Sequence, residues 1–178
     1  MHLKRVVITG IGALTPIGNT TSDYWAALLN GVSGAGPITL FDASKFKTRF
    51  ACQLKGFDPL QYLDKKESRK VDRYTQIALA ASDEAVKDAD IAGDRVNPDR
   101  VGVVFASGIG GLITFQDEVI NFAKGDGTPR FNPFFIPKMI LDIAAGHISM
   151  RHGYRGPNFA VTSACASSTN AMMEAFNL

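Results

Sequence analysis

The stretch at residues 100–111, RVGVVFASGIGG, joins an apolar run directly to a glycine-rich turn. Valine and phenylalanine dominate residues 100–106, which predicts a buried β-strand. The turn SGIGG occupies residues 107–111, and residues 112–123 then place apolar side chains at helical spacing. The stretch therefore predicts a strand that leads straight into a helix, the unit from which α/β sheets are built.

Other parts of the chain show the same order. Residues 158–162, NFAVT, predict another strand, and Cys165 follows at the expected corner between strand and helix. We also predict a buried strand at 6–9, a strand at 49–54, and helices at 21–30, 72–89, 139–151 and from about 166 to the end. Strands alternating with helices predict an α/β layered fold with a largely parallel sheet. The last helix stops without a glycine, proline or basic final turn, so we expect the sequence to be part of a longer chain.

Composition and charge narrow the classes of protein that fit. The chain has 178 residues, of which 46% are hydrophobic and 20% charged, as expected for a globular domain with a core. A net charge of +2, with no face or segment that concentrates most of the 19 Lys and Arg residues, argues against a nucleic-acid partner. No run reaches the roughly 20 apolar residues of a membrane span, and glycines and Pro16 interrupt the only run that resembles a secretory signal.

The two cysteines, Cys52 and Cys165, are far apart and lack the spacing of metal ligands. We therefore expect neither a disulfide framework nor a metal site, and the free thiols favour the reducing cytoplasm. Cys52 lies in the predicted strand at 49–54 and is interpreted as a packed side chain.

The segment TGIGALTPIG at 9–18 resembles a dinucleotide-binding loop, but Thr15 stands where a third glycine is needed. SGIGG lacks the Lys-Ser or Lys-Thr pair of a phosphate-binding loop. A nicotinamide oxidoreductase is therefore the weaker hypothesis. We expect the first glycines to permit a tight strand exit, and those of SGIGG to allow close packing or a narrow pocket.

Cys165 is the main candidate for chemistry. At the first turn of a helix, unpaired N–H groups and the positive end of the helix dipole favour a thiolate and could hold a carbonyl oxyanion. Taken by residue type alone, an inert buried cysteine remains the alternative.

Four motifs together resemble the condensing-enzyme family: RVVITGIGALTPIGN, SGIGGL, FNPFFIP and RGPNFAVTSACASS. They occur in the family's order and approximate spacing over the whole chain. The chain is most similar to elongating β-ketoacyl-(acyl carrier protein) synthases of type II. The resemblance implies a thiolase-like layered fold, with residues 1–178 forming the first of two similar βα halves and ending within the helix that carries the cysteine.

The resemblance also implies roles for individual residues. Cys165 would be the nucleophile that takes an acyl group as a thioester, with its own backbone N–H in the oxyanion hole. Ile109 would line and gate the acyl tunnel. Phe134 and Phe135 would lie near the distal end of the tunnel and the dimer interface, and a plain core role for both remains open.

A basic cluster at 65–70 has two interpretations. The resemblance implies that Lys66, Arg69 and Lys70 dock the acidic carrier protein. The alternative is an ordinary solvated helix face, because Asp64 and Glu67 are interspersed with the basic residues.

The implied activity is that of an acyltransferase of fatty acid biosynthesis. The family condenses the acyl group with malonyl-carrier protein to give 3-oxoacyl-carrier protein, CO2 and free carrier protein, without a bound cofactor, because the substrates are carried on phosphopantetheine. That step needs two histidines and a lysine of the C-terminal half, so we expect these 178 residues alone not to condense. We interpret His147 as structural and His2 and His152 as surface residues. A homodimer is implied, and the alternative function is a non-catalytic scaffold or chain-length partner of a condensing enzyme.

Overall fold

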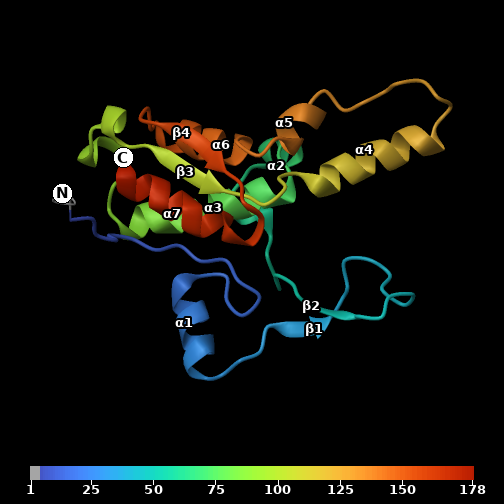
Figure 1. The fold of residues 1–178 in the computed structure, drawn as a ribbon, viewed down its shortest axis with the longest axis horizontal. Helices are drawn as coiled ribbons and strands as arrows, with labels where there is room; N and C mark the ends of the chain where they lie inside the picture. Colours follow the sequence, from blue (N-terminus) through green and yellow to red (C-terminus); the bar gives the residue numbers. More distant parts are fainter. Residues whose placement is uncertain (1–4) are drawn as a thin grey trace.

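A computed structural model describes residues 5–178, so His2 lies outside the described residues. At its centre, two parallel strands pair in the register Val103 with Asn158 through Ala106 with Val161. In Figure 1, β3 crosses between the helices α6 and α7. The prediction of a layered α/β fold with a parallel sheet between helices is thus confirmed.

The helices and strands occur in the following order along the chain: α1 (Thr21–Leu29), β1 (Ala35–Pro37), β2 (Phe50–Cys52), α2 (Lys65–Lys70), α3 (Arg73–Asp88), β3 (Val103–Ala106), α4 (Leu112–Lys124), α5 (Phe135–Met139), α6 (Ile143–His152), β4 (Asn158–Val161) and α7 (Ser167–Asn177). Short 3₁₀ turns lie between them, including η4 (Ala164–Ala166) just before α7. β1 and β2 form a separate antiparallel ribbon. Among residues 5–178, no helix is both long and apolar enough to cross a membrane.

The core lies on one side of the central strands. Val103 and Phe105 of β3 pack against a cluster from the α2–α3 region and α6, made of Leu63, Val71, Ala78, Leu79, Ala144 and Ile148. The alternate residues Val104 and Ala106 line a shallow pocket together with residues of α7. Because side chains alternate between the two faces of a strand, α6 and α7 cover opposite faces of the sheet.

Helix α3 closely matches its prediction of residues 72–89. Asp72 is its N-cap residue and accepts a hydrogen bond from the backbone N–H of Tyr74. The second carboxylate oxygen of Asp72 accepts from the backbone N–H and the hydroxyl of Thr114. Asp72 and Thr114 are both buried, so one carboxylate begins α3 and also ties it to the first turn of α4.

The strand predicted at 6–9 is wrong. The segment forms no strand, and its side chains face outward, with Val7 62% and Ile8 82% exposed. A strand needs a neighbouring backbone, and this part of the chain lies against α3 instead. Asp88 accepts the backbone N–H of Ile11 at 2.9 Å.

Glu84 holds the next part of this segment. Its two carboxylate oxygens accept the backbone N–H groups of Ala13 and Thr21, each at 2.8 Å. A Cβ at Gly12 would come within 1.9 Å of the carbonyl oxygen of Ala81. The N-terminal glycines thus permit close approach to a helix rather than the strand exit that we predicted.

Two other expectations need correction. The helix predicted at 139–151 is broken, because α5 ends at Met139 and α6 begins at Ile143. Ile140 between them is extended, and its carbonyl oxygen accepts the hydroxyl of Tyr74. The predicted packing of Cys52 is also wrong, because its side chain is exposed.

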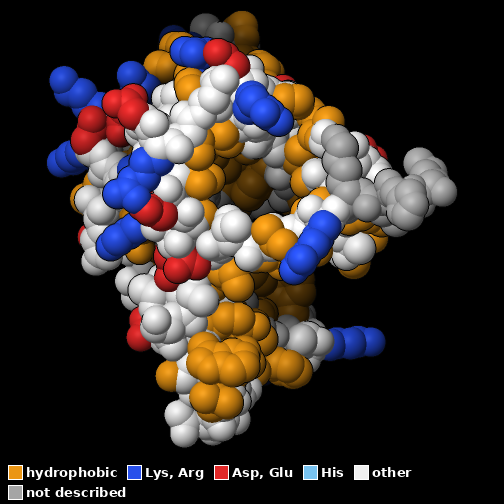
Figure 2. Space-filling model, turned by 90° about the vertical axis from the view of Figure 1, so that its left-hand side faces the viewer, with side chains coloured by type: hydrophobic (Ala, Val, Ile, Leu, Met, Phe, Trp, Pro, Cys, Tyr) orange, Lys and Arg blue, Asp and Glu red, His pale blue; other side chains and the backbone are white. Residues whose placement is uncertain are grey.

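Many apolar side chains of the described residues are exposed. Figure 2 shows hydrophobic side chains around a hollow on one face and over the lower end of the molecule, at the height of α1 in Figure 1. On α1, Trp25 is 61% and Leu29 71% exposed, and on α7, Met172 is 64% exposed. Exposed apolar surface of this extent is typical of a face that is covered in an assembly.

The close approach at Gly12 can be tested by substitution. We expect Gly12→Ala to lower the free energy of unfolding by about 1–3 kcal/mol, because the new methyl group would force the segment away from α3. Gly36→Ala is the matched control, since an added Cβ there meets nothing within 4 Å. Urea denaturation would measure both, and equal effects of the two substitutions would contradict this account.

Candidate functional site

The two turns singled out in the sequence lie at the same edge of the sheet. β3 and β4 are parallel, so the turn after β3 (107–111) and the turn after β4 (162–166) both leave from their carboxyl ends. The hydroxyl of Thr162 donates to the carbonyl oxygen of Gly108 at 3.3 Å. A Cβ at Gly108 would lie 4.0 Å from the carbonyl oxygen of Ala164. SGIGG and the Cys165 turn are therefore in contact.

Cys165 occupies the predicted corner between strand and helix. It lies in η4, directly before α7, and its side chain is exposed. The alternative of a buried cysteine is therefore wrong, because the side chain is exposed. Within the described residues 5–178, no group of His, Cys, Asp and Glu side chains could hold a metal ion.

The backbone beside Cys165 has an unusual conformation that sequence analysis missed. Ala164 has φ of 51°, in the left-handed region that residues with a Cβ seldom adopt. Asp90 is the other non-glycine residue with positive φ within the described part of the chain. Strained backbone of this kind is concentrated at functional sites.

Helix α7 reaches back over this turn with two polar side chains. The hydroxyl of Ser167 accepts the backbone N–H of Ser163 at 2.8 Å and donates to the carbonyl oxygen of Ala164 at 2.7 Å. The amide of Asn170 donates to the hydroxyl of Ser163 at 2.6 Å. Sequence alone gives no signal for these contacts beyond the spacing of three, four and seven residues, which places partners on one side of a helix.

The SGIGG turn packs tightly against the end of α5. The backbone N–H of Gly111 donates to the carbonyl oxygen of Met139 at 3.0 Å. Gly110 has φ of +82°, and a Cβ on it would lie 2.5 Å from the same oxygen. The predicted close packing is confirmed here. Between the flanking glycines, Ile109 is 64% exposed.

Phe134 and Phe135 lie next to each other at the start of α5 but have different surroundings. The ring of Phe135 stacks with the rings of Phe115 and Phe131, with centroids 6.2 and 5.8 Å apart. Phe134 is 41% exposed, and the ammonium group of Lys70 lies 5.6 Å from its ring centroid. Phe135 thus belongs to an aromatic stack between α4 and α5, whereas Phe134 faces α2.

The basic cluster forms a helix of its own, α2, rather than the start of the long helix. Asp64 caps it by accepting the backbone N–H groups of Lys66 and Glu67 at 2.6 and 2.9 Å. Lys66, Arg69 and Lys70 are all exposed. Their spacing of three and four residues places them on one side of α2. The contact between Lys70 and Phe134 connects this basic face to α5 and, through α5, to SGIGG.

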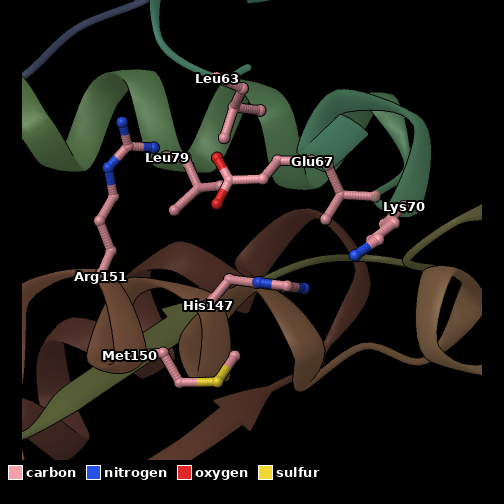
Figure 3. A pocket seen from close by; sticks show the side chains of 8 residues that line it. Leu63, Glu67, Lys70, Leu79, His147, Met150 and Arg151 are labelled. Carbon is pink, nitrogen blue, oxygen red and sulfur yellow. The ribbon is translucent and has the colours of Figure 1, made fainter. Parts of the chain in front are cut away.

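His147 belongs to a different place. It lies on α6, which covers the face of the sheet opposite α7. It lines a pocket of about 530 Å³ between α6 and the α2–α3 region. Figure 3 shows the labelled side chains around this pocket, namely Leu63, Glu67, Lys70, Leu79, His147, Met150 and Arg151. The structure therefore does not bring His147 to the Cys165 turn.

His152 is not the free surface residue that we predicted. Its side chain is only 14% exposed, stacks on Tyr154, and places Nε2 3.2 Å from an oxygen of Asp83. Arg151 Nε lies 3.0 Å from the same oxygen. The ion pair of Arg151 with Asp83, with His152 beside it, joins α6 to α3.

Burial shifts the pKa values of these groups. It lowers the pKa of His152, which the Asp83 carboxylate partly opposes. It also lowers the pKa of His147, against a smaller opposite effect of Glu67. The pKa of Asp83 is raised by burial, which Arg151 and His152 oppose.

These shifts predict a pH dependence of stability. Below the ordinary histidine pKa of 6.5, histidines of the unfolded chain bind protons, whereas the partly buried His147 and His152 of the folded chain bind them less readily because their pKa values are lowered. Stability should therefore rise with pH from the lowered values up to about 6.5 and then level off. Asp83, with its raised pKa, gives the opposite slope at lower pH, where it titrates.

Urea denaturation between pH 5.5 and 7.5 would measure this slope. The double substitution His147→Gln/His152→Gln should flatten it, because neither glutamine titrates. A slope that is unchanged in the double variant would contradict the assignment to these histidines.

The chain was compared with protein families and with known proteins. The family model "Beta-ketoacyl synthase, N-terminal domain" matches residues 3–178. A Synechocystis protein named 3-oxoacyl-(acyl-carrier-protein) synthase 2 is 45% identical over 178 residues, which cover 100% of this chain and 42% of the relative. A Staphylococcus aureus protein (strain COL) of the same name is 46% identical over 176 residues, 98% of this chain and 42% of the relative.

Solved structures of ketosynthases have a similar fold. "The ishigamide ketosynthase/chain length factor" has a TM-score of 0.86 at 25% identity and covers 99% of this chain and 45% of its own. A β-ketoacyl synthase from Burkholderia phymatum has a TM-score of 0.78 at 28% identity and covers 98% and 43%. The chain thus spans about two fifths of the length of the curated relatives that it matches. It belongs to the β-ketoacyl synthase family and corresponds to its N-terminal domain.

Proposed function

We propose that this chain is the acyl-accepting part of a 3-oxoacyl-(acyl carrier protein) synthase of type II, an acyltransferase of fatty acid biosynthesis, with Cys165 as its nucleophile. The observation that carries the proposal is the exposed thiol in a left-handed turn between β4 and α7. The relatives named 3-oxoacyl-(acyl-carrier-protein) synthase 2, which align with the whole chain, support the choice of substrate class.

In the first step, the sulfur of Cys165 attacks the thioester carbonyl of an acyl group held on the phosphopantetheine of the carrier protein. A carbon–sulfur bond to Cys165 forms and the bond to phosphopantetheine sulfur breaks. The proton of the Cys165 thiol ends on the released phosphopantetheine thiol. Hydrogen-bond donors must stabilise the negative charge that develops on the carbonyl oxygen. The backbone N–H of Cys165 is proposed as one of these donors.

In the second step, malonyl-carrier protein loses CO2, and the resulting carbanion attacks the acyl carbonyl. A carbon–carbon bond forms, the bond to Cys165 breaks, and the Cys165 sulfur regains a proton. The resemblance assigns the decarboxylation to two histidines and a lysine of the C-terminal half. His147 is not one of these histidines, because it lies on α6, on the other face of the sheet from α7. Residues 1–178, as an N-terminal thiolase-like half, would therefore hold the acyl group but would not condense it.

The acyl chain needs an apolar path that begins beside Cys165. Ile109 is exposed in the turn that contacts the Cys165 turn, which suits a residue that lines and gates this path. Phe134 and Phe135 follow at the start of α5, whose end packs against SGIGG. Phe135 also fills the aromatic stack between α4 and α5, so it combines the tunnel role with packing.

The partner is an acyl carrier protein, and the docking residues are Lys66, Arg69 and Lys70. Their shared exposed face on α2 suits an acidic protein surface. In the solved structures, a neighbour at 22% identity is described as a ketosynthase in complex with an acyl-carrier protein. The proposal also includes a homodimer, the cytoplasm as location, and no bound cofactor, since the carrier protein brings the phosphopantetheine.

The alternative function is that of a non-catalytic scaffold or chain-length partner of a condensing enzyme. The exposed thiol of Cys165 argues against it. Such a partner needs no nucleophile, whereas Cys165 is presented to solvent from a strained turn.

The nucleophile can be identified directly. We expect the full-length protein, incubated with an acyl-carrier protein thioester, to gain the mass of one acyl group on the peptide that contains Cys165. Cys165→Ala should abolish the gain, and Cys52→Ala, which removes the other exposed thiol, should leave it unchanged. Acylation that persists in Cys165→Ala would overturn the proposal.

Charge reversal tests the docking face. We expect Lys66→Glu/Arg69→Glu/Lys70→Glu to weaken carrier-protein binding at least about tenfold at physiological salt, because three attractions become repulsions. Lys45→Glu, at an exposed lysine between β1 and β2, is the control. Titration calorimetry would measure both, and equal losses in the two variants would reject α2 as the docking face.

A further inference from the structure

The conformation of Ala164 needs an explanation of its own. A Cβ makes the left-handed region unfavourable, and neither glycine nor asparagine, which tolerate it, stands at this position. A residue keeps such a conformation only when surrounding contacts over-determine it. The contacts must therefore be found around Ser163 and Ala164.

Ser167 supplies two of them from a single atom. Its hydroxyl accepts the N–H before the strained residue and donates to the carbonyl oxygen of the strained residue itself. Ser167 is only 4% exposed, so water competes poorly for these hydrogen bonds. Asn170 secures the same turn through the side chain of Ser163.

We propose that Ser167 is a positioning residue that holds the left-handed turn at Ala164 and thereby fixes the direction in which Cys165 presents its sulfur. The inference rests on the proposed function, because it concerns acyl transfer to Cys165. Ser167 itself touches neither the acyl group nor the carrier protein in this role. Its hydroxyl is engaged on both sides by backbone and acts through the turn.

The proposal separates two kinds of reaction at the same thiol. Attack on a docked acyl thioester requires a defined angle and distance between sulfur and carbonyl carbon. Alkylation by a small reagent such as iodoacetamide approaches an exposed thiol from many directions. We call the two hydrogen bonds of the Ser167 hydroxyl the clamp. Loss of the clamp should therefore slow acyl transfer to Cys165 much more than alkylation of Cys165.

The experiment uses the full-length protein with Ser167→Ala. We expect the rate of acyl transfer to Cys165 to fall about tenfold, the size expected for losing two hydrogen bonds. Iodoacetamide labelling of Cys165 should change less than about twofold, as judged against Cys52 in the same molecule. Ser168→Ala, the same chemical change at the exposed neighbouring position, should leave both rates unchanged. An unchanged acyl-transfer rate in Ser167→Ala would overturn the inference.

A second substitution distinguishes positioning from a general packing role. Glycine adopts the left-handed region at little cost, so Ala164→Gly should make the clamp dispensable. We expect Ala164→Gly/Ser167→Ala to recover most of the acyl-transfer rate that Ser167→Ala loses. If Ser167 merely filled space at the start of α7, the added glycine would restore nothing, and that result would refute the proposal.

Amide hydrogen exchange keeps this test separate from the proposed function. In Ser167→Ala the Ser163 amide should exchange faster, because its acceptor is gone, and the amide of Phe105 in β3 should not. Unchanged exchange at Ser163 would count against the clamp even if Cys165 proved not to take an acyl group. Failure of the wild-type protein to acylate Cys165, with faster exchange in the variant, would refute the proposed function and with it the role of Ser167 in acyl transfer, but not the hydrogen bonds by which Ser167 holds the turn.

Discussion

The parallel pairing of β3 with β4 is the constraint on which the candidate site depends. The two strands are separated by more than fifty residues of sequence, yet their register places Ala106 beside Val161. Parallel strands deliver whatever follows them to one edge of the sheet. SGIGG and the Cys165 turn meet for this reason, and a shift in register would move them apart even if each local turn were preserved.

The two faces of this strand pair serve different purposes. On the core side, Val103 and Phe105 pack against the cluster formed with α3 and α6. That cluster fixes the strands, and the Asp83 group adds a polar connection between the two helices. On the opposite side, α7 begins at Ser167, just after the η4 turn that contains Cys165. The core cluster thus holds β3 in place, and the pairing of β3 with β4 determines where α7 begins.

Much of this arrangement could be predicted from local patterns. Residue type and spacing predict three of its elements: the alanine-rich helix α3, the apolar strand β3, and the strand β4 before Cys165. The segment at 6–9 shows the limit of such patterns. Its composition favours a strand, but strand formation depends on an available backbone partner, and the carboxylates of Glu84 and Asp88 bind this part of the chain to α3 instead. His152 was misjudged for a similar reason, because its partner Asp83 is distant in sequence.

Ala164 shows why the finest feature of the site could not be read from the sequence. Left-handed backbone is normally signalled by glycine or asparagine, and alanine gives no such signal. The conformation arises from Ser167 and Asn170, whose own positions at the start of α7 look like ordinary helix sequence. Local preference and tertiary structure disagree at this residue, and such disagreement is expected where function rather than stability selects the conformation. The contacts of this turn with Gly108 run through Thr162 and Ala164, so a different backbone path at Ala164 would change how the Cys165 turn meets SGIGG. The left-handed residue is therefore part of how the chain brings the Cys165 turn against SGIGG within residues 162–166, between β4 and α7.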